Sequence, residues 1–278
     1  MERLENKIFD GERALYEGCD LHLLSCRFEG EADGESALKE SRRILAENCV
    51  FTLRYPLWHD DDVRLVSCEL TDTCRAPLWY SHSVRAEGCR INGTKALREC
   101  RDCEIKDSTV LSDEFGWRSG RVTVADTQAE GAYFMFCAHD LRLDRVTFKG
   151  KYSFQYVRTA VLENCVLDTK DAFWHAENVT VRNSVVKGEY LGWYSKNLTF
   201  ENCVITGTQP LCYCEGLKLV GCEMHDCDLA FEKSCVEATV TTPILSVKNV
   251  LSGRVTAPSI GEIICDGAQY KGLIQTEK

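Results

Sequence analysis

The amino-acid sequence predicts an all-β fold: a single-stranded right-handed parallel β-helix, or solenoid, of about 13 coils with a 19-residue repeat. Three observations predict it. One pattern (apolar, x, apolar, x, x, anchor, x, apolar) recurs along the chain, apolar residues alternate with a period of two, and each repeat is too short to contain a helix. A left-handed hexapeptide helix would show a turn of about 18 residues with shorter subperiods, so the right-handed form is preferred.

The coils are counted by their anchor residues. From Cys89 onward, successive anchors are 19 residues apart; the two longer steps are 23 residues, after Cys26, and 21 residues, after Cys68. The anchors are Lys7, Cys26, Cys49, Cys68, Cys89, Ser108, Thr127, Val146, Cys165, Ser184, Cys203, Cys222 and Thr241. We interpret the anchor cysteines as small buried hydrophobic residues, not as a disulfide framework.

The repeat also defines the domain organisation and the broad class of the protein. Residues 1–242 hold the β-helix repeats, and residues 243–278 are predicted to be strands of the same domain that cap or extend the helix. No apolar run is long enough to span a bilayer, and the first residues already belong to a coil, so we expect a cytoplasmic protein. The net charge of −10 argues against nucleic acid as a partner.

Glycine recurs four residues after many anchors, where we expect a turn with positive φ. The positions are Gly11, Gly30, Gly93, Gly131, Gly150, Gly188 and Gly207.

Two neighbouring columns precede each anchor by about ten residues and carry the informative side chains. The first column holds all five tryptophans together with Lys39, Arg98 and Gln155, and the second is rich in His, Tyr and Glu. Charged residues among the tryptophans argue against a fully buried row, so we predict a partly exposed aromatic groove. The alternative is a half-buried aromatic stack that seals a corner. The predicted binding residues are Lys39, Trp58, Trp79, Arg98, Trp117, Phe136, Tyr156, Trp174, His175, Trp193 and Tyr194.

The second column supplies the candidate catalytic residues. Stacking places His59 between Glu40 and Tyr80, and Arg118 beside Glu99. A carboxylate can orient a His as a general base, and an Arg can stabilise a developing anion; a structural charge ladder is the alternative. His175, near Asp171, is a second candidate centre.

Two insertions place the centre of the groove in the amino-terminal half of the chain. They are Glu29 to Glu35 and Thr71 to Arg75, and they flank His59. Insertions in solenoids tend to gather at the binding face. We predict no metal site and no cofactor, because the repeat itself explains the zinc-like spacings Cys100-x-x-Cys103 and Cys212-x-Cys214.

The segments LRYPLWH, APLWYS, KALREC, GKYSFQY, DTKDAFWHA, GTQPLCYC and DLAFEKS resemble an uncharacterised bacterial family, a domain of unknown function grouped with the pectate-lyase-like right-handed β-helices. The resemblance covers nearly the whole chain and implies the fold. It implies no activity. The Asp clusters of polygalacturonases and the calcium and Arg arrangement of pectate lyases are not recognisable in this sequence.

Two classes of function therefore remain open. The first is binding or modification of a carbohydrate, an oligosaccharide or an anionic glycan, by the aromatic groove; whether the protein is an enzyme stays open. The second is a structural or protein-interaction solenoid. The first coil leaves Leu4, Phe9 and Leu15 uncovered, which predicts a homodimer through the amino-terminal coil, with a monomer protected by charged edge residues as the alternative.

Overall fold

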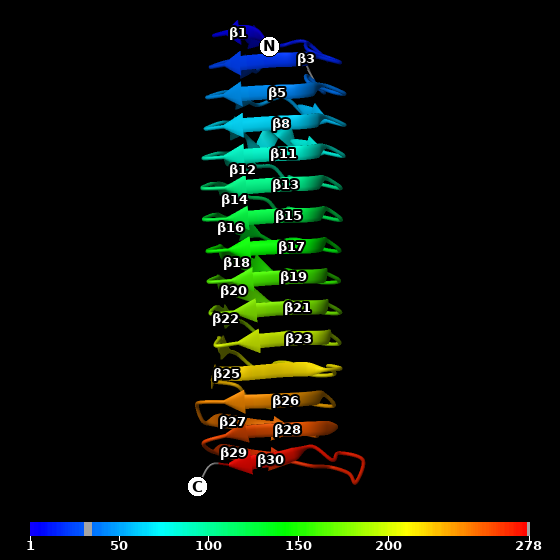
Figure 1. The fold of residues 1–278 in the computed structure, drawn as a ribbon, viewed down its shortest axis with the longest axis vertical. Coiled ribbons are helices and arrows are strands. Elements are labelled where there is room, and N and C mark those ends of the chain that lie inside the picture. The colour runs from blue at the N-terminus through cyan, green and yellow to red at the C-terminus, as the bar shows by residue number, and fades with distance from the viewer. Residues whose placement is uncertain (31–34, 277–278) are drawn as a thin grey trace. The chain divides into compact units, whose positions relative to one another are not determined.

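The computed structural model of the protein describes residues 1–30 and 35–276. The chain divides into two compact units, Met1–Arg142 (unit 1) and Leu143–Lys278 (unit 2). Each unit is built of stacked coils whose strands run parallel to those of the next coil (Figure 1). The predicted fold class, a right-handed parallel β-helix with a 19-residue repeat, is confirmed.

Unit 1 contains two main parallel sheets, because each coil contributes one longer and one shorter strand. The long-strand sheet consists of β1 (Glu2–Glu5), β3 (Cys19–Leu24), β5 (Arg42–Glu47), β8 (Asp61–Val66), β11 (His82–Glu87), β13 (Arg101–Lys106) and β15 (Gly120–Ala125). The short-strand sheet consists of β2 (Ile8–Phe9), β4 (Arg27–Phe28), β6 (Val50–Phe51), β9 (Glu69–Leu70), β12 (Arg90–Asn92), β14 (Thr109–Leu111) and β16 (Gln128–Gly131). A third pair, β7 (Leu57–Trp58) and β10 (Leu78–Trp79), carries two of the tryptophans.

The register of the strands follows the repeat. Val84 pairs with Cys103, and Cys103 pairs with Val122, one repeat later. The second predicted insertion contains a 3₁₀ turn, η1 (Asp72–Cys74). Of the first insertion, residues 31–34 lie outside the described residues. The strands on either side of the two insertions are paired in register: β3 with β5 and β4 with β6 around the first, and β8 with β11 and β9 with β12 around the second.

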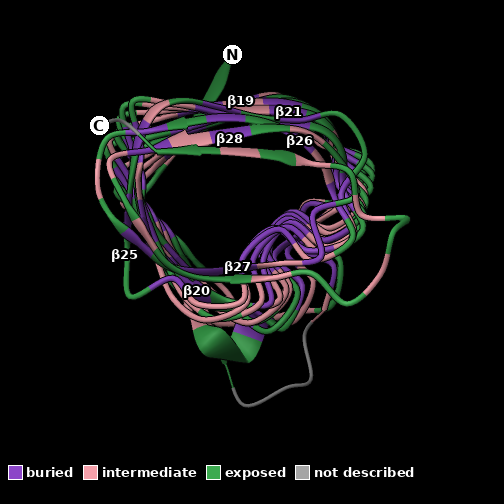
Figure 2. Cartoon of the chain, turned by 90° about the horizontal axis from the view of Figure 1, so that it is seen from below, coloured by how far each residue is buried: buried purple, intermediate pink, exposed green. Residues whose placement is uncertain are grey.

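Unit 2 repeats this arrangement. Its long-strand sheet consists of β19 (Arg158–Glu163), β21 (Glu177–Arg182), β23 (Lys196–Glu201), β25 (Leu217–His225), β26 (Cys235–Val240), β28 (Ser252–Ala257) and β30 (Leu273–Thr276). The short-strand sheet consists of β18 (Thr147–Lys151), β20 (Val166–Lys170), β22 (Val185–Lys187) and β24 (Val204–Thr206), which β25 also extends. Figure 2 shows β19 and β21 on one side of these coils and β20 on the other.

Two further pieces complete the described strands. β17 (His139–Asp144) runs through the junction of the two units, and β27 (Ile244–Lys248) pairs with β29 (Ile260–Ile264). Because β28 and β30 continue the long-strand sheet beyond the last anchor, the coils number about 14 instead of 13. None of the helices among the described residues has the length and apolar character needed to cross a membrane.

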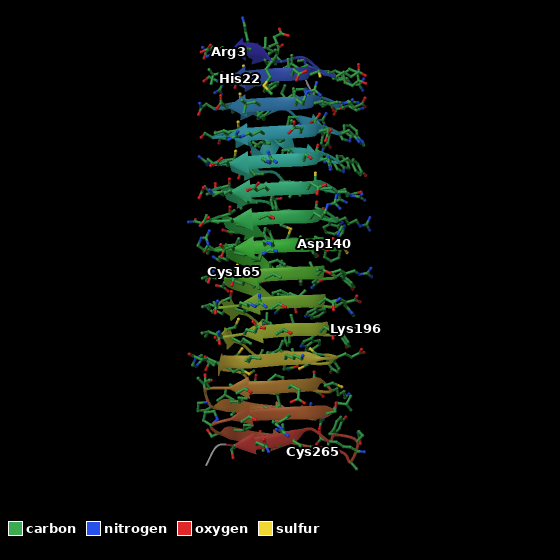
Figure 3. All side chains as sticks on the ribbon, in the orientation of Figure 1. Arg3, His22, Asp140, Cys165, Lys196 and Cys265 are labelled. Atoms are coloured by element: carbon green, nitrogen blue, oxygen red, sulfur yellow. The ribbon has the colours of Figure 1, made fainter. Side chains whose placement is uncertain are left out.

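The interior of each coil is apolar and stacks on apolar residues of the next coil. Phe28 lies between Phe9 and Phe51, with ring centroids 5.0 and 4.6 Å away. All seventeen cysteines are free thiols, and most of them are buried. The Sγ of Cys49 donates to the carbonyl of Leu23 at 3.4 Å, and Cys165, labelled in Figure 3, occupies the equivalent position in unit 2. The thiol thus fills the core and satisfies a backbone acceptor.

The predicted positive φ holds for Gly93, Gly188 and Gly207 but not for Gly11, Gly30, Gly131 and Gly150. At Gly131 the requirement is space, because an added Cβ would overlap the carbonyl oxygen of Ser112 in the preceding coil. Gly207 combines both constraints, with φ of 132° and the Gly188 carbonyl in the place of a Cβ. These glycines allow the close approach of one coil to the next.

We therefore expect Gly207→Ala to lower the free energy of unfolding by on the order of 2–4 kcal/mol, measured by denaturant unfolding. Gly11→Ala is the matched control, because nothing lies within 4 Å of an added Cβ there. Equal stability of the two variants would contradict the assigned role of Gly207.

Candidate functional site

The two informative columns owe their geometry to one left-handed residue in each coil. His59 has φ of 61° and Tyr80 has φ of 53°, and the same conformation recurs at Glu40. Side chains of consecutive residues in a regular strand point to opposite faces, but the left-handed residue breaks this alternation. The rings of Trp58 and His59 consequently stack on each other with centroids 5.9 Å apart.

We call the two columns the tryptophan column and the outer column. In unit 1 the tryptophan column is Tyr16, Lys39, Trp58, Trp79, Arg98, Trp117 and Phe136, and the outer column is Glu17, Glu40, His59, Tyr80, Glu99, Arg118 and Cys137. In unit 2 the corresponding residues are Gln155, Trp174, Trp193, Cys212 and Phe231, and Tyr156, His175, Tyr194, Tyr213 and Glu232.

The tryptophans of unit 1 are half-buried, and their ring faces are covered by neighbouring coils. Trp58 stacks on Trp79 at 5.5 Å and 12°, and the ammonium of Lys39 lies 4.7 Å from the centroid of Trp58. Trp117 lies between the guanidinium of Arg98, at 5.2 Å, and the ring of Phe136, at 4.3 Å. The expected open groove is therefore not formed by this column, which is the half-buried stack that the sequence left as the alternative.

The indole nitrogens distinguish the two units. In unit 2, Trp174 Nε1 donates to the carbonyl of Tyr190 at 2.6 Å, and Trp193 Nε1 donates to that of Gln209 at 2.8 Å. Among the described residues of unit 1, the Nε1 atoms of Trp58, Trp79 and Trp117 are buried without an acceptor. Each such donor costs about 1–3 kcal/mol, so the column of unit 1 is the less satisfied of the two.

The outer column of unit 1 does not form the predicted catalytic pairs. Glu40 accepts a hydrogen bond from Tyr16 Oη at 3.0 Å, which raises the pKa of Tyr16, and its carboxylate lies 3.5 Å from Lys39 Nζ. The exposed ring of His59 stacks on Tyr80 at 5.0 Å. No hydrogen bond joins His59 to Glu40 among the described residues.

The second predicted pair was Arg118 with Glu99, and here too the carboxylate has another partner. Arg98, from the tryptophan column, forms salt bridges with Glu99 at 3.6 Å and with Glu114 at 2.7 Å. Arg118 remains exposed to solvent in its coil. The reason is that half-buried Arg98 needs partners more than an exposed guanidinium does.

One hollow opens beside the outer column of unit 1. Its volume is about 320 Å³, and it is lined by Glu17, Cys19, Glu40, Arg42 and His59. Glu40 and His59 were predicted from the sequence, but Cys19 and Arg42 were not. Each of these two lies two residues after an outer-column residue, so an alignment of the repeats at that position would have found them.

In unit 2 the outer column is a continuous aromatic stack. Tyr156, His175, Tyr194 and Tyr213 lie 4.9, 5.1 and 4.9 Å apart between successive ring centroids, with interplanar angles of 9–13°. Trp174 and Trp193 stack beneath them at 5.4 Å and 6°. The ring faces point along the stack, so the side chains present their edges to solvent.

A charged cluster that the sequence analysis missed lies on unit 1 near the start of β8, β11 and β13. His82 contacts Asp61 through Nδ1 at 2.8 Å and Asp102 through Nε2 at 2.7 Å. Arg121 binds Asp102 through Nε at 2.5 Å and Nη2 at 2.6 Å, which lowers the pKa of Asp102 to about 2. Both contacts of His82 are hydrogen bonds only when both ring nitrogens carry protons.

Within the described parts of the chain, residues 1–30 and 35–276, no group of three or more His, Cys, Asp or Glu side chains could hold a metal ion.

We expect an NMR titration to place the pKa of His82 above its ordinary 6.5, because Asp61 and Asp102 both stabilise the imidazolium. The contribution of this raised pKa to the stability of the fold is fully present below the unfolded-state pKa, and it is lost as pH rises through the folded-state pKa of His82. Asp102→Asn should lower the pKa of His82, whereas Asp62→Asn, an exposed change on β8 next to Asp61, should leave it nearly unchanged. A pKa that is insensitive to Asp102→Asn would refute the assignment.

Solved structures that this chain resembles include mutant tailspike proteins of E. coli bacteriophage HK620 in complex with a pentasaccharide (8% identity, TM-score 0.44) and with a hexasaccharide (8% identity, TM-score 0.45). The matches cover 90% of this chain, which spans only 60–61% of those tailspike chains. No functionally curated protein matches the sequence. Residues 2–275 match the family described as "Protein of unknown function (DUF3737)", and the chain therefore belongs to the DUF3737 family.

Proposed function

We propose that the protein binds a hydroxyl-rich oligosaccharide along the outer column of unit 1. The observation that carries the proposal is the hollow of about 320 Å³ in which Glu17, Glu40, Arg42 and His59 converge. A concave site with several polar side chains beside aromatic rings is typical of small-ligand sites. The three buried indole donors without an acceptor also lie in unit 1, and such unsatisfied groups call for a functional explanation.

The binding mode follows from which surfaces of the rings are free. The faces of Trp58 and Trp79 are occupied by each other and by Lys39, so they cannot stack on sugar rings as the sequence analysis expected. The edges of His59 and Tyr80 are exposed, and carboxylates flank them. These groups recur once per coil, about 4.8 Å apart, and can hydrogen-bond the hydroxyls of successive sugar units. The tryptophan column is the rigid support beneath them.

The charge of the hollow favours a neutral sugar over an anionic glycan. Two carboxylates, from Glu17 and Glu40, face one guanidinium, from Arg42. A sugar carboxylate or sulfate would lie close to both acids, and like charges repel at such distances. Farther along the column, Arg118 offers a positive group that would suit an acidic substituent on one sugar unit only.

The geometry supports binding more than catalysis. The carboxylate of Glu40 is engaged by Tyr16 and Lys39, and that of Glu99 is engaged by Arg98. A general base needs an orienting partner within hydrogen-bond distance, and His59 is held by ring stacking instead. We therefore propose binding of the sugar without a chemical reaction.

We place the protein in the cytoplasm. Its seventeen cysteines are all free, and stacked pairs such as Cys26 and Cys49 lie in contact without a bond. Free thiols at this density suit a reducing compartment.

The test is a glycan array with neutral and acidic oligosaccharides, followed by calorimetric titration of the ligand found. His59→Ala and Tyr80→Ala should each weaken binding about tenfold or more, because each removes a hydrogen-bonding edge, about 1–2 kcal/mol, from the column. Arg64→Ala, an exposed change on the outer face of β8, is the control and should bind normally. Trp58→Ala is unsuitable, because loss of its stack would also destabilise the fold.

Binding that survives both changes in the outer column, or that is lost equally in Arg64→Ala, would contradict the proposed site. Preference for acidic over neutral glycans would contradict the charge argument while leaving the location intact.

A protein-interaction role is the second candidate, and the amino-terminal coil favours it. In this coil Leu4, Phe9 and Leu15 are only half-buried, whereas their equivalents Leu23 and Phe28 are 0% exposed in the next coil. β1 pairs with β3, and no second strand pairs with it among the described residues. We propose that a second copy of the chain covers these residues in a homodimer.

Light scattering coupled to size exclusion should give a dimeric mass at micromolar concentration, and Phe9→Asp should give a monomer. Ile8→Asp is the control, because Ile8 is already 65% exposed and points away from the coil interior. A strictly monomeric wild-type protein, or a dimer that persists in Phe9→Asp, would rule out this interface.

A further inference from the structure

The residue that follows the outer column in each coil turns inward and forms a buried corner column. In unit 1 the column begins at Gly18 and ends at Ala138, and between them it holds five polar residues, Ser41, Asp60, Ser81, Cys100 and Ser119, all at most 2% exposed. Four of these five carry a hydroxyl or a thiol. Asp60 is the one carboxyl, and it directly follows His59 of the proposed site.

A hydroxyl in this column can both accept and donate a hydrogen bond. Ser119 Oγ accepts from the backbone N–H of Cys100 at 3.1 Å and donates to the carbonyl of Leu97 at 3.1 Å. In unit 2, Ser234 Oγ accepts from the N–H of Cys214 at 2.9 Å and donates to the carbonyl of Leu211 at 2.7 Å. Apolar residues also occupy the column, as at Ala138 and Ala176, but a polar side chain there bonds the adjacent coils as acceptor and donor.

Asp60 fills only the acceptor half of this role when it is ionised. Its Oδ1 accepts from the backbone N–H of Ser41 at 2.8 Å. Its Oδ2 is buried without a partner among the described residues, although the column places the carbonyls of Leu38 and Trp58 at the equivalent acceptor positions. A carboxylate has no proton to donate, whereas a carboxylic acid has one donor and keeps its acceptors.

We infer that Asp60 is held as a neutral carboxylic acid that replaces serine in the corner column, and that its ionisation loosens the coil carrying Trp58 and His59. This coil is therefore a pH-sensitive element built into unit 1. The inference rests on burial and hydrogen bonding, and it does not require the proposed ligand.

The surroundings of Asp60 favour the neutral form. Burial raises the pKa of Asp60 to about 8, the N–H of Ser41 lowers it, and the charge of Glu40 in the preceding coil raises it further. In the following coils, Ser81 Oγ accepts a hydrogen bond from the N–H of Asp60 at 3.2 Å, and a charge on Asp60 would raise the pKa of the buried Cys100 thiol. Its neighbours along the chain, His59 and Asp61, have exposed side chains, and no cation contacts the carboxyl among the described residues.

The direction of the pH dependence follows from linkage. In the unfolded chain Asp60 loses its proton near 3.8, whereas the folded protein keeps the proton up to about pH 8. Between these values unfolding releases one proton, so rising pH favours unfolding. Above about pH 8 both states are ionised, and the dependence on Asp60 ends.

The test compares the wild-type protein with Asp60→Asn and Asp60→Ser by urea unfolding between pH 5 and 8, followed by tryptophan fluorescence. Relative to the variants, the wild-type unfolding equilibrium constant should rise about tenfold per pH unit, which is the effect of one proton. Both variants supply a donor and an acceptor at every pH. Asp62→Ser is the control and should keep the wild-type dependence, because Asp62 is exposed two residues away on β8.

A ¹³C NMR titration of the Asp60 carboxyl in the folded wild-type protein tests the inference even where a variant fails to fold. A carboxyl that titrates near 8 supports the inference. A carboxyl that titrates near 3.8, or an identical pH dependence in wild-type, Asp60→Asn and Asp62→Ser, overturns it. Neither outcome depends on whether the protein binds a sugar.

Discussion

The structure of each unit depends on one constraint, the in-register hydrogen bonding of every coil to the next. Parallel pairing such as Val84 with Cys103 and Cys103 with Val122 places equivalent residues one strand spacing apart. A side chain must therefore be compatible with the residues directly above and below it. Phe9, Phe28 and Phe51 stack for this reason, and Gly131, Gly188 and Gly207 leave room for a carbonyl of the preceding coil.

This constraint explains what the sequence alone could predict. A repeat of fixed length determines the register, so the coils, the buried anchor cysteines and the vertical neighbours Trp58 and Trp79 follow from counting residues. The two insertions do not disturb the count, because they lie between paired strands. What periodicity cannot supply is the side of the backbone on which a column lies. The left-handed residue after each tryptophan sets that side, and Glu, His, Tyr and Arg all adopt this conformation here.

The predicted pairing of Glu40 with His59 is not formed, for a related reason. Vertical stacking brought Glu40 and His59 into neighbouring coils, but each side chain has a better partner elsewhere. Glu40 finds the donors Tyr16 and Lys39, and the imidazole of His59 finds the ring of Tyr80. The cluster of Asp61, His82 and Asp102 shows that a contact can also cross columns, since Asp61 is the register partner of His82 but Asp102 lies one position beyond the partner Arg101. Side-chain length and hydrogen-bonding capacity decide between such neighbours, and a column alignment contains neither.

The same constraint also reaches the chemistry of individual groups. A buried column accepts residues that fit the space, either apolar ones such as Ala138 and Ala176 or a serine or cysteine that also bonds the adjacent coils. An aspartate can act there as both donor and acceptor in one protonation state only. The stacking that builds the fold consequently favours the neutral acid, and it does so next to the hollow lined by Glu17, Glu40 and Arg42. In a solenoid of this kind, the residues above and below a titratable group determine its charge as much as its exposure to solvent does.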